Sequence, residues 1–217
     1  MTYLKSFVWI VLASVVCFSV RAADFTLGAE GGVCLSHFTG NDANAWDTKT
    51  DFCGYGLLNL PIDNAWSVFA EAGYCAKGTY VTATDYTITL NYLELPLLLR
   101  YRFPSTPSYP LSAYIGPNFG FLMSAEQDYN GTTSDISDVK STDIGITVGG
   151  MMEIPMNFGS LFFDVRYTQG FNKPLANTNY RSYDLKNCAL AIMAGLNFNL
   201  GTSSRNGVPG EPENRIQ

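Results

Sequence analysis

Eight charged side chains could do chemistry, because they interrupt stretches of sequence that otherwise have the apolar alternation of β-strands. A carboxylate and a guanidinium group that lie close together can form an ion pair, relay a proton or hold a small ion. Buried charges must be paired, since the loss of one partner leaves an uncompensated ion at a cost of roughly 3 to 5 kcal/mol. We therefore predict one shared charge network, made of Glu30, Glu71, Glu94, Arg100, Arg102, Glu153, Asp164 and Arg166.

Cysteine thiols are a second group that could react. Cys34 and Cys53 lie on either side of a long polar segment, so they could face each other and form a disulfide that tethers it. The alternative is that these two thiols, with Cys75 and Cys188, stay unpaired and pack as small apolar groups. The chain has no CxxC spacing and no second type of ligand near the cysteines, so we predict no metal site.

The sequence offers little support for catalysis. The single histidine, His37, follows Ser36, but adjacent residues of a strand point to opposite faces and cannot act together there. The chain also has no G-x-S-x-G elbow, no P-loop and no zinc motif. We predict a protein that is not an enzyme and needs no cofactor.

The strand pattern that must position these residues is clearest between residues 91 and 103. Apolar or aromatic side chains occupy every second position there, and charged or polar ones occupy positions between them. One face would carry Leu93, Leu95, Leu97, Leu99, Tyr101 and Phe103, and the other Tyr92, Glu94, Arg100 and Arg102. An apolar outer face and a polar inner face are typical of a strand in a membrane-spanning β-barrel.

Eight stretches show the alternation. We place strands at residues 24–36, 51–60, 65–76, 88–103, 111–124, 143–154, 160–170 and 187–200. The connections between them are alternately long and short, as expected for a barrel with long extracellular loops and short periplasmic turns. Aromatic residues gather near the strand ends, where they would lie at the two membrane surfaces. The sequence predicts an all-β fold, an eight-stranded antiparallel up-and-down transmembrane barrel.

The two ends of the chain differ from this middle part. Residues 1–22 have a basic start, an apolar run of about fifteen residues and a small-residue site, which together indicate a secretory signal peptide. Cleavage is expected after Ala22, with Ala23 as the alternative, and Cys17 lacks the small preceding residue of a lipidation site. Residues 23–200 would form the barrel. Residues 201–217 are polar and rich in Pro and Gly, which predicts a disordered tail.

Net charge and location limit the partners. The formal charge of −6 and the absence of a basic stripe argue against nucleic-acid binding. We expect a monomer in the lipid of a bacterial outer membrane, with both termini in the periplasm and long loops that could contact an extracellular or envelope protein. The narrow bore of an eight-stranded barrel favours a lumen filled by the charge network over a proton or ion path through it.

One segment resembles a known family. The residues Tyr92-Leu93-Glu94-Leu95-Pro96-Leu97-Leu98-Leu99-Arg100-Tyr101 are similar to the Y-L-E-[IL]-P-L-L-[LI]-[KR]-Y signature of the PorT-like outer-membrane β-barrel domain proteins, often called porin family proteins. Weaker similarities lie at residues 113–117, 149–155 and 164–170. The resemblance implies an outer-membrane location and an eight-stranded barrel, and it carries over no catalytic residues.

Three functions are therefore considered. The favoured one is a structural or interaction role through the loops, and the second is a narrow porin-like channel for ions or small solutes. A lipid-modifying outer-membrane enzyme is the third. A soluble ligand-binding barrel would need the reverse arrangement, with an apolar lumen and a polar exterior.

Overall fold

Strands make up most of the protein in the computed structural model, which describes residues 25–41, 43, 47–81, 85–104, 109–175 and 184–199. No helix in these ranges is long and apolar enough to cross a bilayer. The predicted signal peptide (1–22) and the predicted tail (201–217) lie outside the described residues. The strands are β1 (Thr26–Thr39), β2 (Lys49–Pro61), β3 (Trp66–Val81), β4 (Tyr86–Arg102), β5 (Leu111–Tyr129), β6 (Thr132–Asp135), β7 (Thr142–Met156), β8 (Gly159–Gly170) and β9 (Lys186–Asn199).

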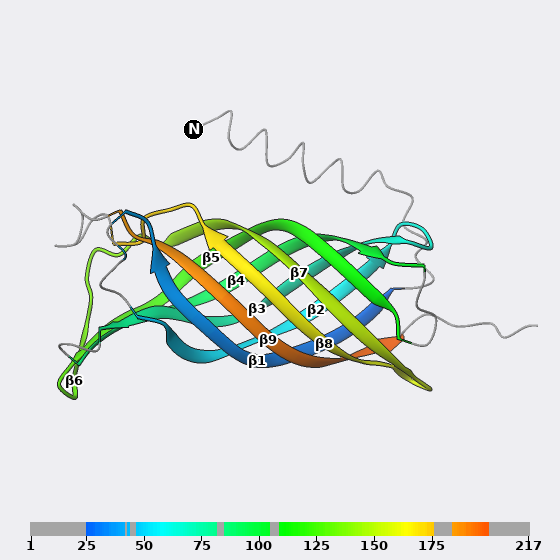
Figure 1. Cartoon of the computed structure of the whole chain (residues 1–217), viewed down its shortest axis with the longest axis horizontal. Helices are drawn as coiled ribbons and strands as arrows, with labels where there is room; N and C mark the ends of the chain where they lie inside the picture. The colour runs from blue at the N-terminus through cyan, green and yellow to red at the C-terminus, as the bar shows by residue number, and fades with distance from the viewer. Residues whose placement is uncertain are drawn as a thin grey trace, which may run out of the picture.

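Eight of these strands close into an antiparallel barrel (Figure 1). Each is hydrogen-bonded to its neighbours along the chain, and β1 pairs with β9 to close the ring. The short strand β6 pairs only with the end of β5, so it lies outside the ring. The predicted eight-stranded up-and-down barrel is confirmed.

The barrel has two unlike ends. Short connections at residues 62–65, 103–110 and 157–158 lie at one end, which we call the turn end. The connections at 40–48 and 171–185, and the segment 130–141 that contains β6, lie at the other end, which we call the loop end. The connection at 82–85 lies there too but has only four residues, because β3 and β4 extend beyond their predicted bounds. At the loop end β4 and β5 continue past the other strands and carry β6 with them (Figure 1).

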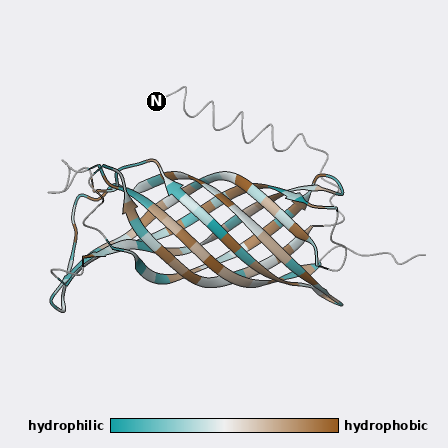
Figure 2. Ribbon diagram, viewed as in Figure 1, coloured by the Kyte–Doolittle hydropathy of each residue, from teal (hydrophilic) through white to brown (hydrophobic). Residues whose placement is uncertain are grey.

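The outer surface is apolar, as the alternation predicted. Leu93, Leu95 and Leu99 of β4 are exposed on the outside, whereas Glu94 and Arg100 are buried inside. Apolar residues recur along the strands around the whole visible face of the barrel (Figure 2). The predicted face assignment for β4 is therefore confirmed.

Aromatic rings mark both ends of this apolar surface. At the turn end Tyr101 packs against Trp66, with ring centroids 4.8 Å apart, and against Phe103 at 5.4 Å. At the loop end Phe52 and Tyr167 are exposed on the outside of the barrel. Rings in two such bands are typical of the levels where a barrel meets the two surfaces of a bilayer.

Inside the barrel, aromatic rings lie over glycines of neighbouring strands. Tyr55 of β2 is paired with Gly73 of β3, where a Cβ atom would approach the Tyr55 ring to 2.4 Å. Phe162 of β8 covers Gly195 of β9 in the same way, with a corresponding distance of 2.3 Å. The missing glycine side chains leave the space that these two rings occupy.

Candidate functional site in the barrel lumen

Arg166 lies at the centre of a buried layer of charge. Its Nε donates to Asp164 Oδ1 at 2.9 Å, its Nη1 to Glu71 Oε2 at 2.6 Å and its Nη2 to Glu30 Oε1 at 2.5 Å. The side chains of these three carboxylates are 0% exposed, and that of Arg166 is 3% exposed. Three strands, β8, β3 and β1, therefore meet at one guanidinium group, which we call the Arg166 layer.

Two tyrosine rings enclose this layer. The guanidinium carbon of Arg166 lies 5.1 Å from the centre of the Tyr55 ring and 5.6 Å from that of Tyr114. The Tyr114 hydroxyl also donates to Asp164 at 2.5 Å. Aromatic faces attract cations, so the two rings hold the guanidinium group while they exclude water from it. One positive group here faces three carboxylates, so the ion pairs with Arg166 are needed to keep these buried carboxylates from being uncompensated.

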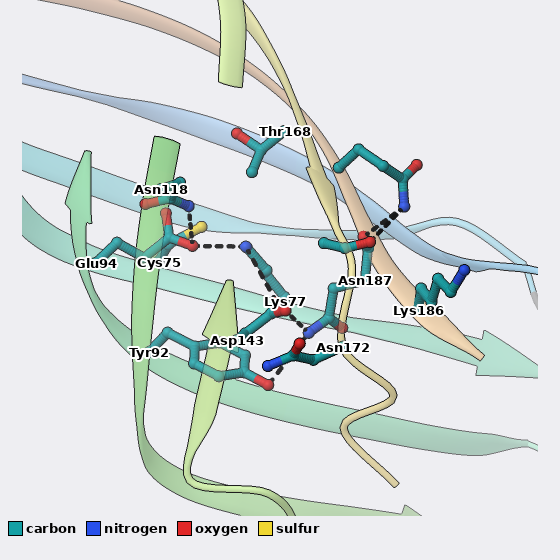
Figure 3. A network of polar contacts seen from close by, with 12 residues as sticks. Cys75, Lys77, Tyr92, Glu94, Asn118, Asp143, Thr168, Asn172, Lys186 and Asn187 are labelled. Carbon is teal, nitrogen blue, oxygen red and sulfur yellow. Dashed lines mark hydrogen bonds and ion pairs between the residues drawn. The ribbon is translucent and has the colours of Figure 1, made fainter. Parts of the chain in front are cut away.

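A second cation, Lys77, holds a layer nearer the loop end (Figure 3). Its Nζ lies 2.5 Å from Glu94 Oε1 and 3.9 Å from Asp143 Oδ2. Asn118 donates to Glu94 at 3.0 Å, and Asn187 donates to Asp143 at 2.8 Å. We call this the Lys77 layer. Because Tyr55 donates its hydroxyl to Glu94 at 2.6 Å while its ring faces Arg166, it links the two layers.

A third group of charges lies at the turn end. Arg102 Nη2 donates to Glu153 Oε2 at 2.8 Å, and Arg100 Nη1 lies 3.5 Å from the other oxygen of the same carboxylate. Arg100 Nε also donates to Ser67 at 3.0 Å. Arg100 is buried, whereas the side chain of Arg102 is 43% exposed, so this group faces the solvent at its outer edge.

Apolar side chains fill the lumen between the turn-end charges and the Arg166 layer, and again beyond the Lys77 layer. One cluster separates the turn-end charges from the Arg166 layer, and it consists of Leu57, Phe69, Leu98, Tyr114, Met151 and Phe162. A second cluster closes the loop end, and it consists of Phe38, Ile88, Leu90, Tyr92, Ala125, Leu175 and Leu185. Leu175 and Leu185 come from the connection between β8 and β9, so a loop contributes to this closure.

All eight residues of the predicted network lie on strands of the barrel, but the structure divides them among three groups. Glu30, Glu71, Asp164 and Arg166 form one group, Glu94 belongs to the Lys77 layer, and Arg100, Arg102 and Glu153 lie at the turn end. The network is thus not continuous, because an apolar cluster intervenes.

The sequence-based network omitted Lys77 and Asp143. Lys77 lies just beyond the strand predicted at residues 65–76, whereas β3 continues to Val81. Strand parity was the available signal, because Lys77 is an even number of residues from Glu71 and so faces the same side. Asp143 also has inward parity at the start of β7, and it is 4% exposed.

The disulfide considered possible between Cys34 and Cys53 is absent from the structure, which agrees with the alternative of unpaired thiols. Both are free buried thiols, as are Cys75 and Cys188. Cys34 is paired in register with Asp51 instead of Cys53, and its sulfur lies 3.8 Å from that of Cys75. Cys34, Cys53 and Cys75 belong to a buried cluster inside the barrel.

Ser36 and His37 do not act as a pair, as strand geometry predicted. Ser36 faces the lumen, is 1% exposed and donates to the carbonyl oxygen of Gly78 at 3.2 Å. His37 follows it in β1 and therefore points to the other face.

Comparison with known proteins agrees with this architecture. Residues 19–175 match the family model described as outer membrane protein beta-barrel domain. The chain belongs to this outer-membrane barrel family. It is accordingly a bacterial outer-membrane protein, and the apolar exterior of its barrel is the surface that faces lipid.

Several solved structures of outer-membrane proteins are similar to this chain at low sequence identity. A major outer membrane protein from Thermus thermophilus is 14% identical, with a TM-score of 0.54, over 82% of this chain and 100% of that one. Neisserial surface protein A is 17% identical over 80% of this chain and 96% of that one, with a TM-score of 0.49. The protein Ail of Yersinia pestis is 14% identical over 80% and 98%, with a TM-score of 0.45. No curated protein matches the sequence.

Proposed function

We propose that this outer-membrane barrel is a sealed anchor that acts through its loop end, in a structural or interaction role. The observation that carries the proposal is the filled lumen. A path along the axis would have to pass the loop-end apolar cluster, the Lys77 layer, the Arg166 layer and a further apolar cluster. An eight-stranded barrel has an interior just wide enough for its own side chains.

The loop end offers the surface for such a role. β4, β5 and β6 form a small sheet there that continues beyond the ring, and all four residues of β6 are exposed. Exposed segments on a rigid barrel are well suited to recognition. The partner would be an extracellular or envelope protein, and the barrel itself would be monomeric.

The proposed orientation places the loop end outside the cell and both termini in the periplasm. It can be tested with Thr133→Cys in β6 and Asn157→Cys at the turn end, both at exposed positions. A membrane-impermeant maleimide should label Thr133→Cys on intact cells and Asn157→Cys only after the outer membrane is permeabilised. The native cysteines Cys34, Cys53, Cys75 and Cys188 are at most 2% exposed and should give little background. Labelling in the reverse order would contradict the orientation.

A narrow channel is the alternative, and conductance decides between the two. Folded wild-type protein in a planar bilayer should pass no measurable current if the lumen is sealed. Discrete current steps from protein with the heat-sensitive gel mobility of a folded barrel would contradict the seal and support the channel.

Lipid modification is the least supported function. Ser36 and His37 point to opposite faces, so they supply no nucleophile with its base. Purified protein should therefore leave lipid A and phospholipids chemically unchanged, and a modified lipid would contradict this part of the proposal.

We further propose that the chain is a PorT-like member of its family. The signature between Tyr92 and Tyr101 supports this. Its charged residues Glu94 and Arg100 face the lumen, where each forms an ion pair. Glu94 binds Lys77, and Arg100 pairs with Glu153. Pro96 lies where the ladder between β3 and β4 is interrupted, as expected for a residue without a backbone N–H.

A further inference from the structure

The turn end of the lumen contains open space. Two adjoining cavities of about 200 and 190 Å³ lie there. They share the residues Thr26, Asn59, Arg102 and Asn199 in their walls. We call the two cavities together the turn-end vestibule.

The inner wall of the vestibule carries two guanidinium groups and one carboxylate, and a second carboxylate, that of the exposed Asp63, lies at the outer wall. Arg100 and Arg102 both lie at its wall, and the single carboxylate of Glu153 is shared between them. A guanidinium group has five N–H donors, and Arg102 commits its Nη2 to Glu153. Its side chain is 43% exposed, so the remaining donors of Arg102 face a space that a ligand can enter.

Two amide side chains add hydrogen-bonding capacity to the same wall. Asn59 and Asn197 are 8% and 4% exposed, and the side-chain oxygen of each has no hydrogen-bond partner among the described residues. Asn59 lines both cavities and Asn197 lines one of them. Both oxygens are shielded from solvent, so a ligand reaches them only after the amides turn toward the cavity, and their lack of a partner favours such a turn.

We propose that the turn-end vestibule binds a small, singly charged organic acid that carries hydroxyl groups. Its carboxylate would lie on the open edge of the Arg102 guanidinium, because a planar carboxylate matches two parallel N–H donors. Its hydroxyl groups would reach the amides of Asn59 and Asn197. At roughly 30 Å³ for each water-sized group, one cavity has room for roughly six such groups.

The charge balance selects a singly charged acid over a phosphate ester. At the inner wall Arg100 and Arg102 exceed Glu153 by one positive charge, which one carboxylate would balance, whereas the whole lining, with Asp63, has no net charge. Asp63 lines the rim of one cavity, so a doubly charged ligand would meet an additional negative group. This inference concerns the turn end alone and does not depend on the proposed role of the loop end.

Calorimetric titration of the full protein in detergent micelles tests the site with three matched probes, namely glycerate, glycerol and glycerol 3-phosphate. Glycerate should bind with a Kd on the order of 1 mM or tighter. Glycerol, which lacks the carboxylate, should not bind measurably, and glycerol 3-phosphate should bind more weakly than glycerate. NMR shifts on glycerate binding should concentrate at Asn59, Arg102 and Asn199.

Two variants locate the effect. Arg102→Gln should weaken glycerate binding about tenfold or more, because it removes charge-assisted hydrogen bonds. Lys140→Gln removes a positive charge at the loop end and should leave the affinity unchanged. Glycerate that does not bind, glycerol that binds as well, tighter binding of the phosphate or NMR shifts elsewhere would each overturn the proposal. The wild-type titration and shifts decide the matter even if Arg102→Gln fails to fold.

Discussion

Arg166 shows how a buried charge can depend on a single side chain. Its guanidinium group contacts carboxylates from three strands, and two tyrosine rings keep it from water. Guanidinium suits this position because its planar donors can bind several carboxylates at once, which the point charge of a lysine does less well. The Arg166 layer can therefore hold the three strands in their arrangement only while Arg166 is present to pair with the carboxylates.

Replacing Arg166 with methionine should strongly destabilise the barrel, because three buried carboxylates then lose their cation. We expect a loss of roughly 3 to 5 kcal/mol in the free energy of unfolding, measured by urea titration in lipid vesicles. Arg102→Met is the matched control and should cost less than about 1 kcal/mol, since Arg102 is half-exposed and Arg100 still pairs with Glu153.

The same experiment separates charge from packing. Adding Glu30→Gln and Glu71→Gln to Arg166→Met removes two unpaired charges and should recover part of the lost stability. Equal stability of Arg166→Met and wild type, or no recovery in the triple variant, would contradict the role given to Arg166.

Asp63 gives a pH-dependent prediction outside the membrane-spanning strands. The backbone N–H groups of Trp66 and Ala65 donate to its Oδ1 at 2.7 and 2.8 Å. These bonds lower the pKa of Asp63 below its ordinary value of 3.8. Because the pKa is lower in the folded state, this contribution to stability is present above the unfolded pKa and is lost as the pH falls through the folded pKa.

We expect Asp63→Ala to lower the urea midpoint at pH 7 and to match wild type once the pH is well below the folded pKa. Urea titrations at a series of pH values would show the two midpoints converging under acidic conditions. Asn64→Ala, in the same turn, should show no such convergence. A difference between Asp63→Ala and wild type that stays constant with pH would rule out the carboxylate as its source.

At the level of strands, alternation predicted most of the fold. It located all eight strands of the ring, because lipid on one side and polar groups on the other impose a period of two on the sequence. It failed where strands leave that environment. β3 and β4 pair beyond the predicted bounds, with Thr79 opposite Ile88, and β6 lies wholly outside the ring. Segments outside the lipid lack the contrast that reveals a strand.

The candidate site was predictable only in part for a related reason. Parity shows which residues face the lumen, but it does not show how far along the axis each one lies. Glu94 and Arg100 both face inward, yet Glu94 binds Lys77 and Arg100 binds Glu153. Leu98 has the same inward parity, and its apolar cluster lies between the turn-end charges and the inner layers. Ile88 and Leu90, also inward, belong to the cluster that closes the loop end.

Register between β2 and β3 can be tested through the glycine beneath Tyr55. A Cβ atom at residue 73 would lie 2.2 Å from the carbonyl oxygen of Gly54 and 2.4 Å from the Tyr55 ring. We expect Gly73→Ala to cost about 1 to 3 kcal/mol in the free energy of unfolding, because the backbone of β2 must move. The ring of Tyr55 would also shift away from Arg166.

Gly56→Ala is the control within the same pair of strands. Its Cβ atom would have only one neighbour within 4 Å, the carbonyl oxygen of Ala72 at 3.9 Å. Its cost should be well below that of Gly73→Ala in the same urea titration. If the two variants lost equal amounts of unfolding free energy, the close packing of Tyr55 on Gly73 would not be the cause of the loss in Gly73→Ala.

The whole molecule combines an apolar exterior with charged layers inside, which is the reverse of a soluble ligand-binding barrel. Adjacent residues of one strand show this directly. Val165 is 49% exposed, while its neighbours Asp164 and Arg166 are 0% and 3% exposed. Stability should therefore respond to a charge on the outer surface in a way that depends on its depth in the membrane.

Arginine at Val165 should be costly because this residue lies midway along β8, far from the aromatic rings at either end. In lipid we expect Val165→Arg to lower the free energy of unfolding by roughly 2 to 4 kcal/mol, and Phe103→Arg, at the turn-end aromatic band, by about 1 kcal/mol or less from the charge itself. Urea titration in vesicles measures both variants. If Val165→Arg were as stable as wild type there, the outer surface would be facing water, and the charged layers inside could not be explained as the polar interior of a membrane barrel.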